Sequence, residues 1–279
     1  MANPSHEAQG TERAIWAVRT AGGAPWRVAE GAAPALSPDG RHVLYVRDGQ
    51  IFRARVAPGT VTAAVDTGGL PFLKQWGRQS TPRWSPDGSK IAFVSDRDNH
   101  ALIGIYDVRT RRVDFVAPSV DCDASPTWSP DGKQIAFTRR PGTPFGLQAQ
   151  EGTGGIGNPT GPAAALAAGR GGRGGVLGCG GVAAGRGGGA APVGARGEGR
   201  GGSDTTRDRR APGLYTATFR GGYTLSVMIA DVSSCPAATP RGLGAECAAR
   251  ELWHNAPNDR TFTAINRMMW GTDQIVFPL

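Results

Sequence analysis

Residues 84–93 read Trp-Ser-Pro-Asp-Gly-Ser-Lys-Ile-Ala-Phe, and residues 128–137 read Trp-Ser-Pro-Asp-Gly-Lys-Gln-Ile-Ala-Phe. An earlier copy without the tryptophan, Ser-Pro-Asp-Gly-Arg-His-Val-Leu-Tyr, occupies residues 37–45. A degenerate fourth copy, Trp-Gly-Thr-Asp-Gln-Ile-Val-Phe, occupies residues 270–277. The first three copies recur at intervals of about 44–48 residues. Such a period is typical of repeat proteins, in which each unit covers apolar surface of its neighbours.

Each copy combines a tight turn with a strand. In Ser-Pro-Asp-Gly, proline presets the backbone angle of the second position, aspartate can bond its own backbone and glycine accepts the exit geometry. The short continuous apolar run after the turn is typical of a strand that is buried on both faces. The predicted structural residues are Pro38, Asp39, Gly40, Trp84, Asp87, Gly88, Trp128, Asp131, Gly132 and Trp270.

Further strands are expected on either side of short turns. Residues 43–47 and 50–56 flank Asp48-Gly49, a dipeptide typical of two-residue hairpins. A polar cluster at residues 96–100 joins the next two apolar runs in the same way. No helical periodicity competes with this pattern, so each unit is predicted to be an antiparallel meander of about four strands.

Meanders that repeat at about 40–45 residues are typical of β-propellers, whose blades expose edges that only neighbouring blades can cover. The Trp-Ser-Pro-Asp-Gly-x-x-Ile-Ala-Phe pattern resembles the repeat of TolB-like propellers and of the N-terminal propeller in the prolyl oligopeptidase and dipeptidyl peptidase IV superfamily. Residues 14–25, 249–254 and 270–278 resemble the peptidase branch more closely. The expected fold class is all-β, an incomplete propeller of about four to five four-stranded antiparallel blades.

The number of repeats indicates that these residues do not complete a ring. About 205 of the 279 residues lie outside the insertion described next, which is enough for four to five units at the observed period. The families that the pattern resembles use roughly seven or eight blades. We therefore expect the chain to be a fragment, with the remaining blades as its partners.

The composition changes sharply at about Pro141 and changes back at about Pro212. Between them the chain is rich in Gly, Ala and Arg and holds over half of the 43 glycines. Such a segment cannot bury enough apolar surface to offset its ordering entropy, so we expect disorder there. The expected organisation is a disordered start (1–12), propeller blades (13–140), a Gly/Ala/Arg-rich insert (141–212), and a blade with the start of the next (213–279).

The formal net charge of +8 lies partly on this insert, which has about eight arginines against four acidic residues. A solvated insert is the favoured interpretation. An anion-binding segment is the alternative, although the insert lacks the interleaved Phe or Tyr of RNA-binding Arg-Gly repeats. Nucleic acid is therefore not an expected partner. A membrane span is not expected either, since no run of about 18 apolar residues occurs.

Residues of catalytic or metal-binding type are scattered. The Gly-x-Ser-x-Gly nucleophile elbow of α/β-hydrolases is absent, and the four histidines lie far apart, at residues 6, 42, 100 and 254. The acidic pairs Asp96-x-Asp98 and Asp121-Cys122-Asp123 lack further ligands at the spacing that calcium or zinc sites need. No catalytic, cofactor-binding or metal-binding residue is assigned, and no cofactor is expected.

The four cysteines bear on the cellular compartment. Cys235 and Cys247 bracket a connection between two predicted neighbouring strands, whose ends should meet, so a disulfide is predicted, with two unpaired thiols as the alternative. Cys122 and Cys179 have no evident partner in the sequence. A disulfide implies an oxidising compartment. A periplasmic or secreted location is also what the resemblance implies.

The resemblance implies one of two functions. In the first, the chain is the non-catalytic propeller portion of a serine peptidase of the dipeptidyl or prolyl oligopeptidase type, and it restricts the access of peptide substrates to a hydrolase domain missing from this chain. In the alternative, it is a stand-alone TolB-like periplasmic binding or scaffold propeller.

The same repeats predict positions in the fold. Trp84, Trp128 and Trp270 are expected at equivalent positions, at the start of each blade's innermost strand and packed between blades. The Ile and Phe side chains of residues 91–93, 135–137 and 275–277 are expected to be buried.

Overall fold

The computed structural model describes residues 13–58, 69–74, 76–97, 100–142, 179, 219–233, 235, 247–257, 265 and 267–278. Within these ranges every regular element is a β-strand, as the all-β prediction requires. The expected disordered start (1–12) lies outside the described residues. So does the expected insert (141–212), except for Pro141, Gly142 and Cys179.

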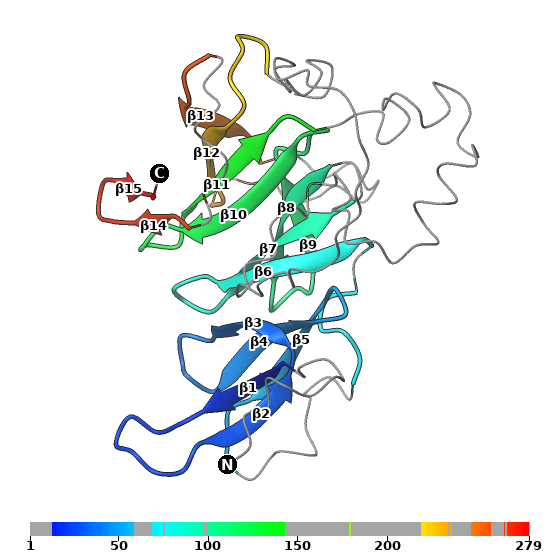
Figure 1. The fold of residues 1–279 in the computed structure, drawn as a ribbon, viewed down its shortest axis with the longest axis vertical. Coiled ribbons are helices and arrows are strands. Elements are labelled where there is room, and N and C mark those ends of the chain that lie inside the picture. The colour runs from blue at the N-terminus through cyan, green and yellow to red at the C-terminus, as the bar shows by residue number, and fades with distance from the viewer. Residues whose placement is uncertain are drawn as a thin grey trace, which may run out of the picture.

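The strands form four sheets. We divide the eight-stranded sheet at the single parallel pair that joins β10 to β8, which gives five groups numbered as blades 1 to 5 in chain order (Figure 1). Blade 1 contains β1 (Ala14–Ala17) and β2 (Trp26–Glu30), and blade 2 contains β3 (Ala32–Leu36), β4 (His42–Arg47) and β5 (Gln50–Arg55). Blade 3 contains β6 (Arg78–Trp84), β7 (Lys90–Asp96), β8 (Ala101–Asp107) and β9 (Val113–Val116). Blade 4 contains β10 (Cys122–Trp128), β11 (Gln134–Arg140), β12 (Ser226–Asp231) and β13 (Ala249–His254), and blade 5 contains β14 (Met269–Trp270) and β15 (Ile275–Val276).

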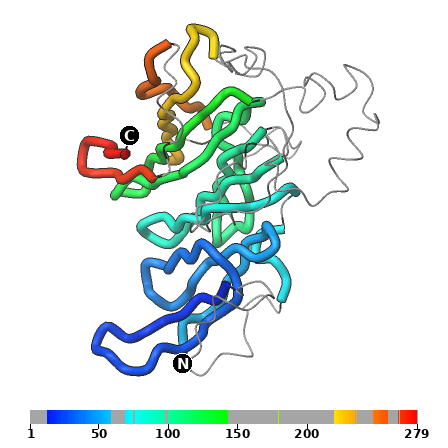
Figure 2. Tube along the Cα trace, in the orientation of Figure 1, coloured from blue at the N-terminus to red at the C-terminus, as the bar shows by residue number. Residues whose placement is uncertain are grey.

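The blades stack side by side in an arc, in the order of the chain (Figure 2). Their first strands are neighbours, because β3 contacts β6, β6 contacts β10 and β10 contacts β14. The arc is an incomplete β-propeller, and the described strands form no closed ring. We call the side of the arc formed by the first strands its inner face.

Blade 4 is assembled from segments that lie far apart in the sequence. Strand β11 pairs with β12 in antiparallel register, from Gln134 opposite Asp231 to Arg139 opposite Ser226. The long connection that contains the Gly/Ala/Arg-rich insert therefore joins two adjacent strands of one blade.

The Ser-Pro-Asp-Gly turns are held by the same hydrogen bonds in blades 2, 3 and 4. In blade 3 the Ser85 hydroxyl donates to Asp87 Oδ1 at 2.6 Å and accepts from the Lys90 N–H at 2.8 Å, while Asp87 Oδ1 also accepts from the Ser89 N–H at 3.0 Å. These bonds recur around Asp39 and Asp131. Each of these aspartates has a pKa below its usual range, and the largest cause is the hydrogen bond that it accepts from the serine hydroxyl.

Neighbouring turns also pack on one another, which gives a prediction for the turn glycines. Gly40 and Gly132 both have φ of +70°, but a Cβ at Gly132 would lie 3.4 Å from Cδ of Pro86 in the preceding blade, whereas one at Gly40 would meet nothing within 4 Å. Gly40→Ala should lower the free energy of unfolding by about 1–2 kcal/mol through backbone strain alone. Gly132→Ala should lower it further, since the Pro86 ring must also move. Urea denaturation of both variants measures the difference, and equal losses would mean that turn packing contributes nothing.

The apolar runs after the turns lie in the second strand of each blade. The prediction that their Ile and Phe side chains are buried is confirmed for blades 3 and 4, where all four are 0% exposed: Ile91, Phe93, Ile135 and Phe137. It is wrong for Ile275 and Phe277, which are only partly buried. Ile275 lies in β15 and Phe277 directly follows it, and β15 has β14 as its one partner among the described strands.

The repeat tryptophans end the first strands, and do not begin them as expected. Trp84, Trp128 and Trp270 are the last residues of β6, β10 and β14, because the turn that follows joins the first strand of a blade to the second. For Trp84 and Trp128 the expected equivalence is visible in a shared contact. Trp84 Nε1 donates to the Ala35 carbonyl oxygen at 3.2 Å, and Trp128 Nε1 donates to the Arg83 carbonyl oxygen at 3.1 Å. Each acceptor lies at the same position of the preceding blade, so these bonds tie neighbouring blades together.

Candidate functional site

Each first strand of blades 2, 3 and 4 contains a β-bulge three residues before its end. Ala33, Thr81 and Ser125 have φ of +52°, +47° and +54°, and the strand register shifts around each of them. A proline follows each time, at residues 34, 82 and 126. Proline has no N–H to donate and is tolerated at a bulge. A left-handed backbone at a residue other than glycine stores strain, which often accompanies functional sites.

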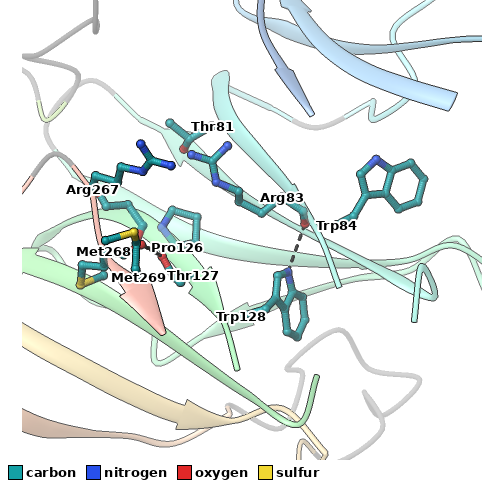
Figure 3. Close-up of a pocket in the computed structure, with 10 residues that line it drawn as sticks. Thr81, Arg83, Trp84, Pro126, Thr127, Trp128, Arg267, Met268 and Met269 are labelled. Carbon is teal, nitrogen blue, oxygen red and sulfur yellow. Dashed lines mark hydrogen bonds between the residues drawn. The ribbon is translucent and has the colours of Figure 1, made fainter. Parts of the chain in front are cut away.

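Two of these bulges, at Thr81 and Ser125, lie at a pocket on the inner face, between blades 3, 4 and 5 (Figure 3). The pocket has a volume of about 390 Å³, within the range of small-molecule and peptide sites. Strands β6 and β10 and the segment leading into β14 supply its walls: Thr81, Arg83, Trp84, Ser125, Pro126, Thr127, Trp128, Arg267, Met268 and Met269.

Hydrogen bonds hold the segment that leads into β14 against strand β10. The Ser125 hydroxyl donates to the Ile265 carbonyl oxygen at 3.2 Å, and the Thr127 hydroxyl donates to the Met268 carbonyl oxygen at 3.3 Å. The side chains of β10 therefore position Arg267 and the two methionines at the pocket.

Two arginines give the pocket its charge. The guanidinium groups of Arg83 and Arg267 point toward one another, with Thr81 beside them (Figure 3). Burial, and then the neighbouring Arg267 charge, lower the pKa of Arg83, but a guanidinium stays charged at neutral pH. Neither group forms an ion pair within the described part of the chain, and both side chains are exposed to solvent.

A buried ion pair lies in blade 4, whose strand β10 also lines the pocket. Arg139 on β11 binds Asp123 on β10 through two bonds, Nε to Oδ1 at 2.7 Å and an Nη to Oδ2 at 2.8 Å, and it donates to the Ala117 carbonyl oxygen at 2.7 Å. Burial raises the pKa of Asp123 to about 6, while the guanidinium acts in the opposite direction. The acidic pair at residues 121 and 123 therefore supplies a cross-strand contact, since the Asp123 carboxylate is occupied by Arg139.

The structure pairs all four cysteines. Cys235 is bonded to Cys247, with Cα atoms 4.7 Å apart, and Cys122 is bonded to Cys179, with Cα atoms 5.1 Å apart. The second pair has a sequence separation of 57 residues, so nothing local in the sequence indicates it. It ties the start of β10 to a residue of the long connection in blade 4.

The disulfides predict a labelling result. Alkylation of the unfolded, unreduced protein should add no label to any cysteine, and alkylation after reduction should add four, as read by intact mass. Replacing both Cys235 and Cys247 by serine should lower the free energy of unfolding by under about 3 kcal/mol, since the loop they close is short. Labels on the unreduced protein would contradict the pairing.

Those histidines and acidic residues that the structure describes do not gather into a chemical centre. His42, His100 and His254 lie in blades 2, 3 and 4, and His254 stacks on Tyr223 with ring centroids 4.1 Å apart. The described ranges hold no group of three His, Cys, Asp or Glu residues that could bind a metal ion. His6 and Asp98 lie outside them. None of the described segments forms a helix long and apolar enough to cross a membrane.

Sequence reasoning missed the pocket and its two arginines. A signal for the bulge was present, because Ala-Pro, Thr-Pro and Ser-Pro precede the turn motif at the same distance at residues 33–34, 81–82 and 125–126. Arg83 directly follows one of these prolines. Arg267 belongs to the degenerate fourth copy, in which the proline is replaced by Met268, so the repeat gives no sign of it.

Comparison with known proteins identifies the repeats. Residues 28–156 match the model of the TolB beta propeller domain, PD40. Over 71 residues the chain is 34% identical to the uncharacterized peptidase YuxL of Bacillus subtilis, a match that covers 24% of this chain and 11% of that protein. The chain thus spans about a tenth of the length of this curated relative.

Solved structures include distant likenesses. TolB from Acinetobacter baumannii is 25% identical, over 48% of this chain and 34% of that chain, with a TM-score of 0.38. The propeller domain of the Trilobed protease from Pyrococcus furiosus is 19% identical, over 47% of this chain and 41% of that chain, with a TM-score of 0.34. The tricorn protease is 10% identical, over 85% of this chain and 17% of that chain, with a TM-score of 0.37.

Proposed function

Because residues 28–156 carry TolB-type β-propeller repeats, we propose that the chain is the non-catalytic propeller portion of a serine peptidase of the dipeptidyl or prolyl oligopeptidase type. Its blades would restrict which peptides reach a hydrolase domain that these 279 residues do not include. The observation that carries the proposal is the stretch of 71 residues that is 34% identical to a curated peptidase. The proposed division is blades at 13–140, an insert at 141–212, and a further blade with the start of the next at 213–279.

The alternative is a stand-alone TolB-like binding or scaffold propeller. It is supported by the matching family model, which is named for the TolB beta propeller domain. The pocket on the inner face is compatible with either function, since both require a surface that contacts peptide or protein.

A periplasmic or secreted location is part of both proposals. It is supported by the two disulfides, because such bonds persist in oxidising compartments and are rare in the cytosol.

The coding sequence that follows codon 279 separates the two functions. The peptidase proposal expects further propeller repeats, then a Gly-x-Ser-x-Gly motif followed by Asp and His, and a gene product that is labelled by a fluorophosphonate probe. A stop codon directly after the remaining repeats, together with no labelling, would favour the binding propeller.

A further inference from the structure

The pocket on the inner face has the composition of a site for an anion. Two guanidinium groups, from Arg83 on β6 and Arg267 before β14, face each other across it (Figure 3). Both side chains are exposed in the empty pocket, so water screens their repulsion there, and an anion held between them would interact with both charges. Guanidinium groups match the planar geometry of a carboxylate, to which each can donate two hydrogen bonds.

A third polar group at the same place has no partner. The Thr81 hydroxyl is shielded from solvent and forms no hydrogen bond in the described part of the chain. Buried hydroxyls almost always have a partner, and one that lacks it calls for an explanation. Thr81 lines the pocket next to Arg83 (Figure 3), and rotation of its side chain would bring the shielded hydroxyl to an anion held by the arginines.

Most of the remaining lining is apolar, and the Ser125 and Thr127 hydroxyls that also line the pocket already donate to backbone carbonyl oxygens. Pro126, Met268 and Met269 line the pocket together with the two tryptophans, and Met269 is 53% exposed. A bare inorganic ion would leave this surface in contact with water, whereas an anion attached to an apolar side chain would cover it. A volume of about 390 Å³ accommodates such a group.

We infer that this pocket binds a carboxylate carried by a peptide, with Arg83, Arg267 and the Thr81 hydroxyl holding the carboxylate and the apolar walls contacting the residue that bears it. The choice of a peptide rests on the proposed function, and the choice of a carboxylate rests on the pocket alone. The carboxylate can come from a peptide C-terminus or from an Asp or Glu side chain.

Fluorescence anisotropy with the full chain and fluorescein-labelled Gly-Ala-Ala-Leu peptides tests the inference. The peptide with a free C-terminal carboxylate should bind about 10-fold or more tightly than its C-terminal amide, because charge-assisted hydrogen bonds are lost in the amide. An amidated peptide with an internal Glu distinguishes the two sources of carboxylate: restored binding assigns the side chain, and continued weak binding assigns the C-terminus. Equal binding of the free acid and both amides, or no binding of any carboxylate, would overturn the inference.

Substitutions locate the binding. Arg83→Gln and Arg267→Gln should each weaken binding of the free acid about 10-fold or more, while leaving the amide unaffected. Arg109→Gln, which removes an exposed arginine from the turn between β8 and β9, is the matched control and should leave binding unchanged. Unchanged affinity in both pocket variants would overturn the proposed site.

Thr81→Val separates binding from stability. If the hydroxyl serves a ligand, its loss should weaken binding severalfold without lowering the thermal midpoint of the free protein, since the hydroxyl has no partner there. A lowered midpoint with unchanged binding would assign Thr81 a purely structural role and remove it from the site. If the chain binds the carboxylate peptide but no hydrolase motif follows codon 279, only the peptidase proposal is overturned. If the motif is present but the peptide does not bind, only the carboxylate site is overturned.

Discussion

Phe93→Ala is expected to lower the free energy of unfolding by about 3–5 kcal/mol, as measured by urea denaturation. The Phe93 ring is 0% exposed and belongs to one core cluster with Leu44 and Ile51 of blade 2 and Tyr106 of blade 3. Truncation would leave a cavity between two blades, which the surrounding strands can fill only in part. Phe277→Ala, which removes a partly buried ring from the end of the arc, is the control and should have a smaller effect.

Gly104 offers a sharper form of the same test. It lies opposite Phe93 on β8, and a Cβ at this position would come within 2.5 Å of the Phe93 ring. Gly104→Ala alone should therefore destabilise the protein by about 1–3 kcal/mol through overpacking. In the Phe93→Ala background the added methyl group meets empty space, so the same change should be neutral or stabilising. Additive losses would contradict the packing of Phe93 on the glycine backbone.

The second large effect is expected for Arg139→Ala, which should cost about 3–5 kcal/mol because it leaves a charge buried without its partner. The Asp123 side chain is 0% exposed and that of Arg139 is 12% exposed, so solvent cannot replace the lost bonds. Lys90→Ala is the matched control. It breaks the partly exposed pair of Lys90 and Asp107, whose N–O distance is 3.1 Å, and should cost under about 1 kcal/mol.

The dependence on pH identifies the cause of the Arg139→Ala loss. A carboxyl whose pKa is raised in the folded state stabilises the protein below its unfolded pKa of about 3.9, and this contribution is lost as the pH rises through the folded pKa. The pKa of Asp123 is already raised to about 6, and removal of the guanidinium should raise it further. The deficit of the variant should therefore be smaller at about pH 5 than at about pH 8. Asp123→Ala combined with Arg139→Ala should abolish this difference, and a deficit independent of pH in the single variant would assign the loss to packing alone.

The repeating turns and the propeller could be predicted from sequence because their signals are local. Proline, aspartate and glycine fix the turn within four residues, and the φ of +70° to +72° at Gly40, Gly88 and Gly132 follows from that choice. The position of the tryptophans was predicted wrongly for a related reason. The turn marks a boundary between two strands, but the local sequence does not show which of them is the innermost strand of the blade.

The pocket and the second disulfide could not be predicted because they depend on contacts between distant residues. Arg83 and Arg267 meet only when three blades are aligned, and Cys122 meets Cys179 across 57 residues of sequence. The bulges could be predicted only in part. Proline at each is visible in the sequence, but the positive φ of the residue before it is an unusual conformation that neighbouring strands must impose.

Both indole hydrogen bonds run from a later blade to an earlier one, from Trp84 to Ala35 and from Trp128 to Arg83. Because each bond links a blade to the one synthesised just before it, the bond can form as soon as the later blade has left the ribosome. Assembly can thus proceed vectorially during translation, with every finished blade serving as the template for the next.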